Sequence, residues 1–435
     1  MKHFARAVSL ALCLALAVSL MAGLPLAAAE GELDFLTEDL FPTLENPNVT
    51  IVYNLTQEQY QQQLADNPNA LDNIFETKKL FEKKYGGTVN IVGVPWEQMG
   101  SKTVSMQAAD DAPDLYLLSD QSFPLLAVKN ILQPIDKVWD ASWIDPVYLG
   151  MYEWKGQHYG AGLGPFDVPY IMFNKTMFEL EGIKDPYQRW LEGNWNFDAF
   201  YECGAALTKD TDGDGAVDQY GFSTWGSYVS QLIISNGGRL VSFDQEGYHV
   251  GVKDPKTVEA LAFIQKMITL PGGFLNVENY ATFQQDFVAG KLAMTHGVYM
   301  PKPSQMKDDI GIVPFPYGPS TTKDTVMIAT YGWGLVNGAK NPKGAEAFLY
   351  LNDQMQRHDA RFTEANKALY GEYYDMLFNT PGRAYEYSND RNINDVWGLF
   401  WAMADELRNG VPPATVAETY DPLIYAACEK SYGPQ

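Results

Sequence analysis

Four aspartates lie close together between Asp210 and Gly221, and their spacing is suited to metal binding. They occupy positions 1, 3, 5 and 9 of a loop with Gly215 at position 6 and the Ala216 carbonyl at position 7, as in an EF-hand calcium loop. Position 12 is Gly221, so the bidentate glutamate of such a loop is missing. Two interpretations stay open: a polar turn with solvated carboxylates, or a structural Ca²⁺ site formed by Asp210, Asp212, Asp214, Ala216 and Asp218.

The sequence carries no familiar catalytic motif. No two of its five histidines are three or four residues apart, which excludes the helical histidine pair of many zinc sites. Neither a Gly-x-Ser-x-Gly nucleophile elbow nor a His-Glu-x-x-His zinc motif occurs. We therefore expect a protein that is not an enzyme, and we expect no cofactor other than a structural Ca²⁺ in the aspartate loop.

Polar side chains that directly follow a buried strand are candidates for ligand contacts. The apolar run Leu115–Leu118 predicts such a strand, and Ser119 and Asp120 follow it. In open α/β sheets, ligands bind beyond the carboxyl ends of parallel strands. Both residues are therefore candidates, although an aspartate at this place can equally cap the next helix.

These candidates are set among alternating strand and helix patterns. Strands are expected at Val49–Tyr53, Thr88–Val94, Leu115–Leu118, Tyr170–Asn174, Leu292–His296 and Ile310–Val313. Helices are expected at Leu71–Tyr85, Gln98–Ala109, Gln121–Lys129, Phe197–Leu207, Tyr228–Asn236, Pro255–Leu270, Pro342–Leu351 and Asn394–Asn409. The alternation predicts βαβ units and the α/β class, with mostly parallel sheets flanked by helices.

The N-terminal segment 1–29 is expected to be a signal peptide that is removed after export. Basic residues precede an apolar run from Val8 to Leu26, and Ala27–Ala29 supplies small residues for cleavage. A retained membrane anchor is the alternative, but the acidic N-terminal tail at 30–47 favours cleavage. We expect an extracellular or periplasmic protein that is associated with the cell envelope.

The three cysteines say little about function. Cys13 lies inside the signal segment and follows Leu12, whereas a lipidation site requires a small residue there, so the sequence does not support a lipid anchor. Cys203 and Cys428 remain. They form either a disulfide or two buried thiols, and two cysteines exclude a disulfide scaffold.

The overall charge restricts the ligand. The 435 residues contain 31 Lys and Arg against 54 Asp and Glu, which gives a net charge of −23. A chain this acidic repels polyanions, so nucleic acid is excluded as a partner and anionic membrane surfaces are disfavoured. A neutral or cationic ligand is expected.

Six short segments occur in a fixed order along the chain. They are Ala112–Asp120, Tyr170–Phe178, Leu207–Lys209 with Tyr220–Phe222, Phe287–Tyr299, Gly311–Pro316, and Gly332–Gly334 ahead of Lys340–Phe348. Together they resemble the bacterial extracellular solute-binding proteins of ABC importers (family 1), in particular the carbohydrate binders similar to maltose-binding protein. Their order makes the resemblance specific to the family, but not to one sugar.

The resemblance implies a two-lobed, periplasmic-binding-protein-like fold with three hinge crossovers and the ligand between the lobes. The crossovers are expected near Gly164–Pro169, near Val313–Pro316 and at the end of the Pro342–Leu351 helix. The N-terminal lobe would comprise residues 48–166 and 315–353, and the C-terminal lobe residues 167–314 and 354–435. The implied function is the capture of an oligosaccharide by a monomer and its delivery to the permease subunits of an ABC importer.

Three ligand contacts are carried over from the family's motifs. Asp167 is the acid seven residues before Asn174, Tyr299 is the stacking aromatic after Ala-Met-x-x-Gly-x, and Trp397 is the stacking tryptophan thirteen residues before Gly410. Aromatic faces cover the C–H surface of a sugar, while carboxylates and hydroxyls orient its rim. On the same grounds, we expect contacts from Trp225, Tyr228, Trp333 and Trp401.

Other roles for these residues stay open. Trp397 and Trp401 are four residues apart on one expected helix, so both can belong to a core-facing stripe. Trp333 stands between two glycines, a pattern that allows close approach of a ligand. The acidic and basic pair that maltose binders carry after their first strand is missing after Tyr53, which argues against maltose itself.

Two other functions fit the same composition. A secreted glycan-cleaving enzyme would also be acidic and aromatic, but it needs two carboxylates about 5–9.5 Å apart, and no local pattern selects such a pair. A binding protein for peptides or polyamines would suit an acidic site. Incubation with glycans separates the first alternative, because only an enzyme forms product.

Overall fold

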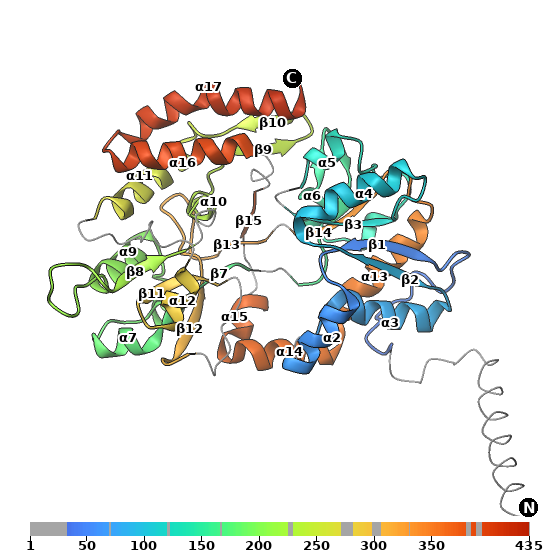
Figure 1. Ribbon diagram of the computed structural model, residues 1–435, viewed down its shortest axis with the longest axis horizontal. Coiled ribbons are helices and arrows are strands. Elements are labelled where there is room, and N and C mark those ends of the chain that lie inside the picture. The colour runs from blue at the N-terminus through green and yellow to red at the C-terminus, as the bar shows by residue number, and fades with distance from the viewer. Residues whose placement is uncertain are drawn as a thin grey trace, which may run out of the picture.

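The protein is built around two β-sheets that lie side by side along its long axis (Figure 1). We call the part around the first sheet the N-lobe and the part around the second sheet the C-lobe. The computed structural model describes residues 33–68, 71–119, 122–165, 168–224, 229–270, 282–297, 306–329, 331–379, 384–388 and 394–434.

The N-lobe sheet has five strands in the order β2-β1-β3-β14-β6. Strands β1, β2 and β3 are parallel, whereas β14 runs antiparallel to both β3 and β6. The strands are β1 (Val49–Tyr53), β2 (Val89–Gly93), β3 (Leu115–Leu118), β6 (Gly160–Ala161) and β14 (Gly332–Leu335). The helices of this lobe are α2 (Gln57–Asp66), α3 (Asn73–Tyr85), α4 (Met99–Ala108), α5 (Leu125–Val128), α6 (Pro146–Gly150) and α13 (Pro342–His358).

The C-lobe sheet has four strands in the order β12-β7-β11-β8. Only β11 and β8 are parallel, while β7 is antiparallel to both of its neighbours. The strands are β7 (Tyr170–Asn174), β8 (Tyr220–Ser223), β11 (Leu292–Gly297) and β12 (Ile310–Pro314). The helices are α7 (Lys175–Leu180), α8 (Pro186–Leu191), α9 (Phe197–Ala206), α10 (Gln231–Ser235), α11 (Pro255–Ile268), α12 (Phe283–Val288), α16 (Asn394–Arg408) and α17 (Pro413–Tyr432).

The chain passes between the lobes after β6, after β12 and after α13, so the α/β class and the two-lobed fold are confirmed. The sheets are mixed, because one strand in each, β14 or β7, runs against all the others; most strands of each sheet share one direction, as expected. A strand that leaves a sheet toward the other lobe and a strand that enters it from there run in opposite directions. Strands β6 and β14, and likewise β12 and β7, are such pairs, and each pair is antiparallel.

The smaller elements lie around and between the lobes. Helices α14 (Ala360–Tyr370) and α15 (Tyr374–Phe378) follow the third crossover, and strands β13 (Thr325–Met327) and β15 (Ala384–Glu386) form a parallel pair near the middle of the molecule (Figure 1). Two antiparallel hairpins complete the fold. They are β4 (Glu153–Trp154) with β5 (Gln157–His158), and β9 (Val241–Asp244) with β10 (Gly247–Val250).

Strands β1, β3 and β7 have the predicted bounds, while several helices differ from the prediction. Helix α13 continues beyond Leu351 to His358, because Asn352 and Asp353 are buried and their polar groups find partners. Helices α2 and α17 were not expected. The first buries Tyr60 alone and begins with a Thr56 capping box, and the second contains Pro422.

Two crossovers are held together by one buried carboxylate. Asp353 in α13 accepts the Gly164 N–H at 2.7 Å and the Arg357 Nε–H at 2.9 Å, and its side chain is 5% exposed. Gly164 has φ +72°, a conformation that favours glycine. This carboxylate therefore ties the first crossover to α13, the helix that precedes the third crossover.

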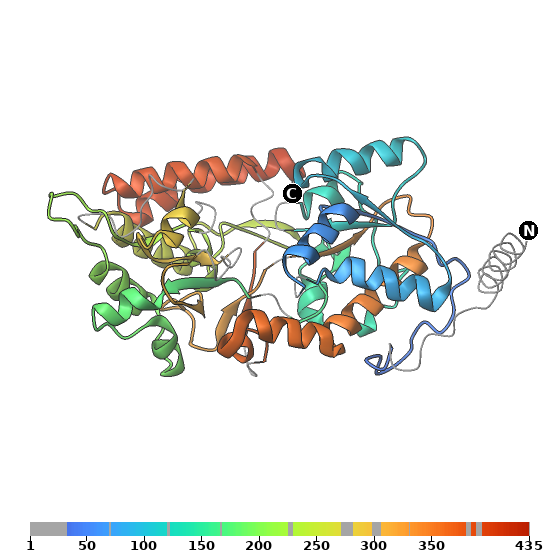
Figure 2. The ribbon, with the colours of Figure 1, turned by 60° about the horizontal axis from the view of Figure 1, so that its bottom comes forward.

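A cluster of aromatic rings joins the lobes away from these crossovers. Trp154 in β4 packs against Phe243 in β9 and Tyr432 in α17, with ring centroids 5.9 and 5.4 Å apart. The Lys155 N–H also donates to the Asp244 carbonyl at 3.1 Å. We call Trp154, Phe243 and Tyr432 the aromatic clasp. Figures 1 and 2 both show the C-terminal end of α17 reaching toward the N-lobe.

The described part of the acidic tail packs against the back of the N-lobe. Phe41 is buried and lies 5.5 Å from the Tyr350 ring, and the Tyr85 hydroxyl donates to the Phe41 carbonyl at 2.7 Å. Lys84 pairs with Asp39 at 2.5 Å. The tail therefore contributes to the N-lobe core. Elsewhere, Cys203 and Cys428 are both buried and are not disulfide-bonded, so the disulfide alternative is wrong.

Candidate functional site

In each large sheet, the strand ends at which the crossovers leave and enter are directed toward the other lobe. Strand β6 ends at Ala161 and β7 begins at Tyr170, so the end of β6 and the start of β7 lie on opposite sides of the first crossover. Strand β12 ends at Pro314, which pairs with Tyr170, and β14 begins at Gly332, which pairs with Leu118. We call these the facing edges. The N-lobe edge also contains the ends of β1, β2 and β3, and the C-lobe edge the ends of β8 and β11.

A tyrosine and a carboxylate are paired at the N-lobe edge. Tyr53, the last residue of β1, donates its hydroxyl to Asp72 Oδ2 at 2.7 Å, and Asp72 also caps α3 through the Ile74 and Phe75 N–H groups. Burial raises the pKa of Tyr53 well above its ordinary value, and Asp72 raises it further. Burial also raises the pKa of Asp72, and this effect outweighs the hydrogen bonds, which lower it. The pair orients the Tyr53 ring, which lies 5.8 Å from Trp333.

Two further aromatic rings lie at the same edge. Tyr331 directly precedes β14 and is 48% exposed, and Trp96 follows β2. Their rings are 6.3 Å apart in an edge-to-face arrangement. An exposed ring that is supported by a second ring offers a flat apolar surface to a ligand. The sequence predicted none of Trp96, Tyr331 and Tyr53 as a ligand contact, because none of them belongs to a motif of its own.

The C-lobe edge combines close packing with hydroxyl groups. A Cβ on Gly297 would lie 1.9 Å from the Tyr170 ring, so only glycine fits at the end of β11. In the same strand, Thr295 donates its hydroxyl to the carbonyl of Ser223 in the neighbouring strand β8 at 2.7 Å. Thr224 follows β8 and is fully buried. This edge is therefore densely packed, and its described polar side chains include the hydroxyls of Thr224 and Thr295 beside the buried His296.

The structure places some of the predicted site residues and not others. Ser119 is buried at the end of β3, and its N–H donates to Ser122 Oγ at 2.9 Å. Trp333 is 4% exposed within the N-lobe core, so a ligand could stack on it only if the ring were uncovered. Trp397 and Trp401 in α16 flank Phe400, at 5.4 and 5.5 Å between ring centroids, and both are partly buried. Their ligand roles stay predictions.

The remaining predicted contacts lie outside the described residues. They are Asp120, Asp167, Trp225, Tyr228 and Tyr299. By sequence, Asp120 follows Ser119 at the N-lobe edge, and Trp225 follows Thr224 at the C-lobe edge. Their roles as ligand contacts also stay predictions.

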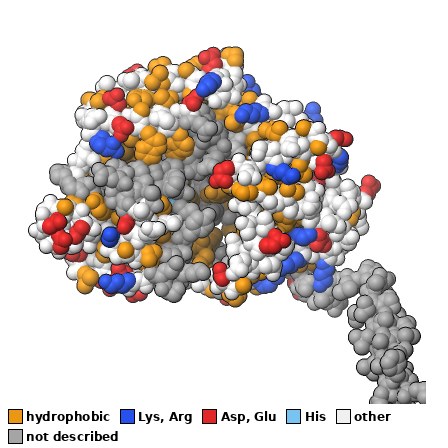
Figure 3. Space-filling view, in the orientation of Figure 1, with side chains coloured by type: hydrophobic (Ala, Val, Ile, Leu, Met, Phe, Trp, Pro, Cys, Tyr) orange, Lys and Arg blue, Asp and Glu red, His pale blue; other side chains and the backbone are white. Residues whose placement is uncertain are grey.

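The aspartate loop lies between α9 and β8, far from the facing edges. Its acidic side chains are visible at the left tip of the molecule in Figure 3. Carboxylate oxygens of Asp210, Asp212 and Asp218 all lie within 4.8 Å of one another, whereas Asp214 accepts the Ala216 N–H at 2.8 Å. A Cβ on Gly221 would lie 2.1 Å from the Gly204 carbonyl, so the twelfth position cannot carry a glutamate.

Hydrogen bonds within the loop hold its shape. Asp210 accepts the Gly213 and Gly215 N–H groups at 2.6 and 2.8 Å, and Asp218 accepts the Thr211 N–H and hydroxyl at 2.8 and 2.7 Å. These bonds lower the pKa of both carboxyls. The loop is thus preformed, with three exposed carboxylates that could hold Ca²⁺.

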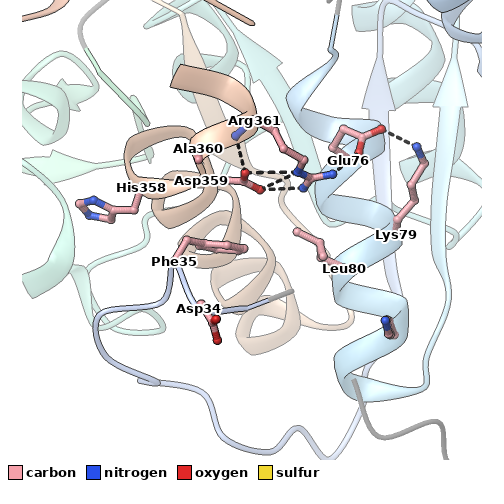
Figure 4. Close-up of a pocket in the computed structure, with 10 residues that line it drawn as sticks. Asp34, Phe35, Glu76, Lys79, Leu80, His358, Asp359, Ala360 and Arg361 are labelled. Carbon is pink, nitrogen blue, oxygen red and sulfur yellow. Dashed lines mark hydrogen bonds and ion pairs between the residues drawn. The ribbon is translucent and has the colours of Figure 1, made fainter. Parts of the chain in front are cut away.

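A cavity of about 690 Å³ lies beside the third crossover rather than between the facing edges (Figure 4). Arg361 in α14 pairs with Asp359 at 2.7 Å and with Glu76 in α3 at 3.2 Å, and Lys79 also pairs with Glu76. The residues that line the cavity also include Phe35 of the N-terminal tail. Because each carboxylate of the network already has a partner, we interpret this cavity as part of the hinge and not as the ligand site.

Comparisons with known proteins agree on the kind of molecule. The family model described as bacterial extracellular solute-binding protein matches residues 45–351. Putative binding proteins of Brucella abortus (strain 2308) and Brucella suis biovar 1 (strain 1330) are each 26% identical over 312 residues, which cover 66% of this chain and 70% of theirs. Among the described residues, no helix is both long and apolar enough to cross a bilayer.

Solved structures share the fold at low sequence identity. The extracellular solute-binding protein from Staphylococcus aureus in complex with maltose has a TM-score of 0.65 at 14% identity, over 90% of this chain and 100% of that one. An ABC substrate-binding protein from Listeria monocytogenes in complex with cycloalternan gives 0.62 at 16%, over 89% and 99%. UgpB from Mycobacterium tuberculosis in complex with glycerophosphocholine gives 0.62 at 16%, over 88% and 99%. Because the family model matches most of the chain, this protein belongs to the bacterial extracellular solute-binding proteins.

Proposed function

We propose that the chain is the substrate-binding component of an ABC importer and that it captures an oligosaccharide between its lobes. The observation that carries the proposal is the pair of rings at the N-lobe edge, Tyr331 and Trp96, together with a C-lobe edge that carries threonine hydroxyls. Rings cover the C–H surface of a sugar, and uncharged polar groups bind its hydroxyls. The net charge of −23 agrees with a neutral ligand.

The wider cycle follows from this role. The chain would be exported with removal of residues 1–29, act as a monomer outside the cytoplasm, and deliver its ligand to permease subunits without catalysis. The fold has relatives in complex with maltose and cycloalternan, which supports a saccharide, and one in complex with glycerophosphocholine, which keeps a phosphodiester as the second candidate.

A thermal-shift screen decides between these ligands. The panel contains maltose, maltotriose, maltotetraose, xylotriose and raffinose, with glycerophosphocholine and spermidine as non-sugar arms. A saccharide at 100 times its Kd should stabilise the protein by about 2.7 kcal/mol. A shift with glycerophosphocholine or spermidine alone would contradict the proposal.

Product analysis in the same samples tests the absence of catalysis. Chromatography after prolonged incubation should return each saccharide unchanged. Cleavage products would instead support a glycan-cleaving enzyme. Small-angle scattering adds a third readout, because lobes that close on a ligand make the molecule more compact.

A further inference from the structure

Two buried polar atoms on either side of the connection between β8 and α10 lack a hydrogen-bond partner in the described structure. They are the hydroxyl oxygen of Thr224, a residue with 0% exposure, and the amide oxygen Oε1 of Gln231. Buried polar atoms are almost always paired, because leaving one unpaired costs its full desolvation penalty. An unpaired atom at such a place therefore needs an explanation.

The position of the two atoms suggests what pairs them. Thr224 directly follows β8, whose end lies beside the end of β11 at the C-lobe facing edge, and Gln231 is the first residue of α10. They stand at the two ends of the connection between β8 and α10. By contrast, the Thr295 hydroxyl in the adjacent strand β11 is paired with the Ser223 carbonyl at 2.7 Å. Both ends of the connection between β8 and α10 therefore carry an unpaired buried atom, whereas the hydroxyl of the neighbouring Thr295 is satisfied.

We propose that Thr224 and Gln231 are specificity-determining residues that bind hydroxyl groups of the ligand, an inference that rests on the proposed function. A threonine hydroxyl both donates and accepts, whereas the amide oxygen of glutamine only accepts. The Gln231 oxygen therefore requires a ligand group that donates, and a sugar hydroxyl does so. An ionised phosphate or carboxylate has no hydrogen to donate, so the pair favours a neutral polyol over an anion.

Replacement of the unpaired hydroxyl by a group of similar size should change stability and ligand binding in opposite directions. Thr224→Val removes the unpaired hydroxyl at nearly constant volume, so it should raise the Tm of the ligand-free protein. The same change should weaken saccharide binding by about fivefold to tenfold, since one hydrogen bond is lost. Gln231→Met should weaken binding to a similar extent, and Thr224→Ser, which keeps the hydroxyl, should retain the wild-type affinity.

The test combines calorimetric titration with thermal unfolding. The probe is maltotriose or, if the wild-type protein does not bind it, the tightest binder among maltotetraose, xylotriose and raffinose. Thr295→Val is the matched control for stability: its hydroxyl is paired, so the same substitution should lower Tm. A rise in Tm for Thr224→Val together with weaker binding, rescued by Thr224→Ser, supports the inference.

Other outcomes overturn it in recognisable ways. A lower Tm for Thr224→Val means that the hydroxyl has a protein or water partner. A higher Tm with unchanged affinity means that the hydroxyl is unpaired but does not touch the ligand. If the wild-type protein binds no saccharide, both the proposed function and this inference fail. If the wild type binds a saccharide and neither substitution changes the affinity, only this inference fails.

Discussion

The Tyr53 hydroxyl donates to the Asp72 carboxylate at 2.7 Å and so links the end of β1 to the N-terminus of α3. Asp72 accepts two N–H groups as well, so its acceptor capacity is used within the protein. The carboxylate therefore positions the Tyr53 ring and does not serve as a free ligand contact.

Asp72 should make stability depend on pH in a defined direction. Its folded-state pKa is raised by burial, so the folded protein holds the proton more tightly than the unfolded chain, whose pKa is about 3.9. The group therefore contributes stability as the pH falls through its folded pKa. Asp72→Asn retains the helix cap and abolishes this dependence.

Urea unfolding of both proteins between pH 7 and pH 4 provides the measurement. The difference in unfolding free energy should shift in favour of the wild type as the pH falls. A difference that stays constant over this range would mean that Asp72 titrates normally. Tyr53→Phe is the control, because it removes the hydroxyl and leaves the carboxyl in place.

Glu76 should act in the opposite direction. Burial alone would raise its pKa, but hydrogen bonds from Lys79 and Tyr60 and the charge of Arg361 outweigh burial and hold the pKa below its usual value. Its stabilising contribution is present above the unfolded pKa of about 4.3 and is lost as the pH falls through the lower folded pKa. Glu76→Gln should cost about 1–3 kcal/mol at pH 7.

Chemical unfolding at pH 7 and pH 3 checks this expectation. The cost of Glu76→Gln should be smaller at pH 3, where the wild-type carboxylate begins to protonate. An equal cost at both values would assign the effect to packing. Lys367→Gln is a suitable control, since the ion pair of Lys367 is with the exposed Glu364 and such surface pairs contribute little.

The aromatic clasp should stabilise the molecule and hold the lobes together. Trp154→Ala removes a buried indole and should cost about 3–5 kcal/mol. Because Trp154 touches residues of the C-lobe, the same change should also increase the radius of gyration of the ligand-free protein in scattering experiments.

Trp195→Ala separates the two effects of the clasp. Trp195 is 1% exposed within the C-lobe and donates to the Pro314 carbonyl at 2.8 Å. It should destabilise the protein to a similar degree without changing its dimensions. An unchanged radius for Trp154→Ala would show that the clasp does not control the separation of the lobes.

Tyr331 should matter for binding more than for stability. Its ring is 48% exposed, so Tyr331→Ala should leave the Tm of the ligand-free protein nearly unchanged. Loss of one stacking surface should weaken saccharide binding roughly tenfold, which corresponds to about 1.4 kcal/mol. Calorimetric titration measures the effect, with Leu180→Ala, an 82% exposed residue at the end of α7, as the control. Unaltered affinity would remove Tyr331 from the site.

The aspartate loop offers a separate test. We propose that Asp210, Asp212 and Asp218 bind a structural Ca²⁺, because their carboxylate oxygens converge in a preformed loop. Millimolar Ca²⁺ should raise the Tm of the wild type, and Asp212→Asn should abolish the rise without changing the Tm in chelator. Equal melting temperatures with Ca²⁺ and with chelator would show that the loop is a polar turn that binds no Ca²⁺.

The sequence alone determined those helices and strands whose residue pattern lies within the element itself. Strands β1, β3 and β7 are short apolar runs bounded by polar residues, and they were predicted with the correct bounds. Helix α17 was missed because Pro422 lies within it, and α2 because only Tyr60 in it is buried. The two-lobed fold followed from the order of six motifs, since each motif belongs to a different part of the architecture.

Only the tertiary structure decided which distant residues meet. The antiparallel entry of β14 and β7 follows from the crossovers, and no pattern within a strand records its direction. Likewise, the approach of Tyr331 to Trp96 joins the residue before β14 to a residue after β2, which are far apart in sequence. The unpaired state of Thr224 depends on every neighbour of the end of β8. Local composition specifies elements, whereas burial and pairing arise only when the whole chain has packed.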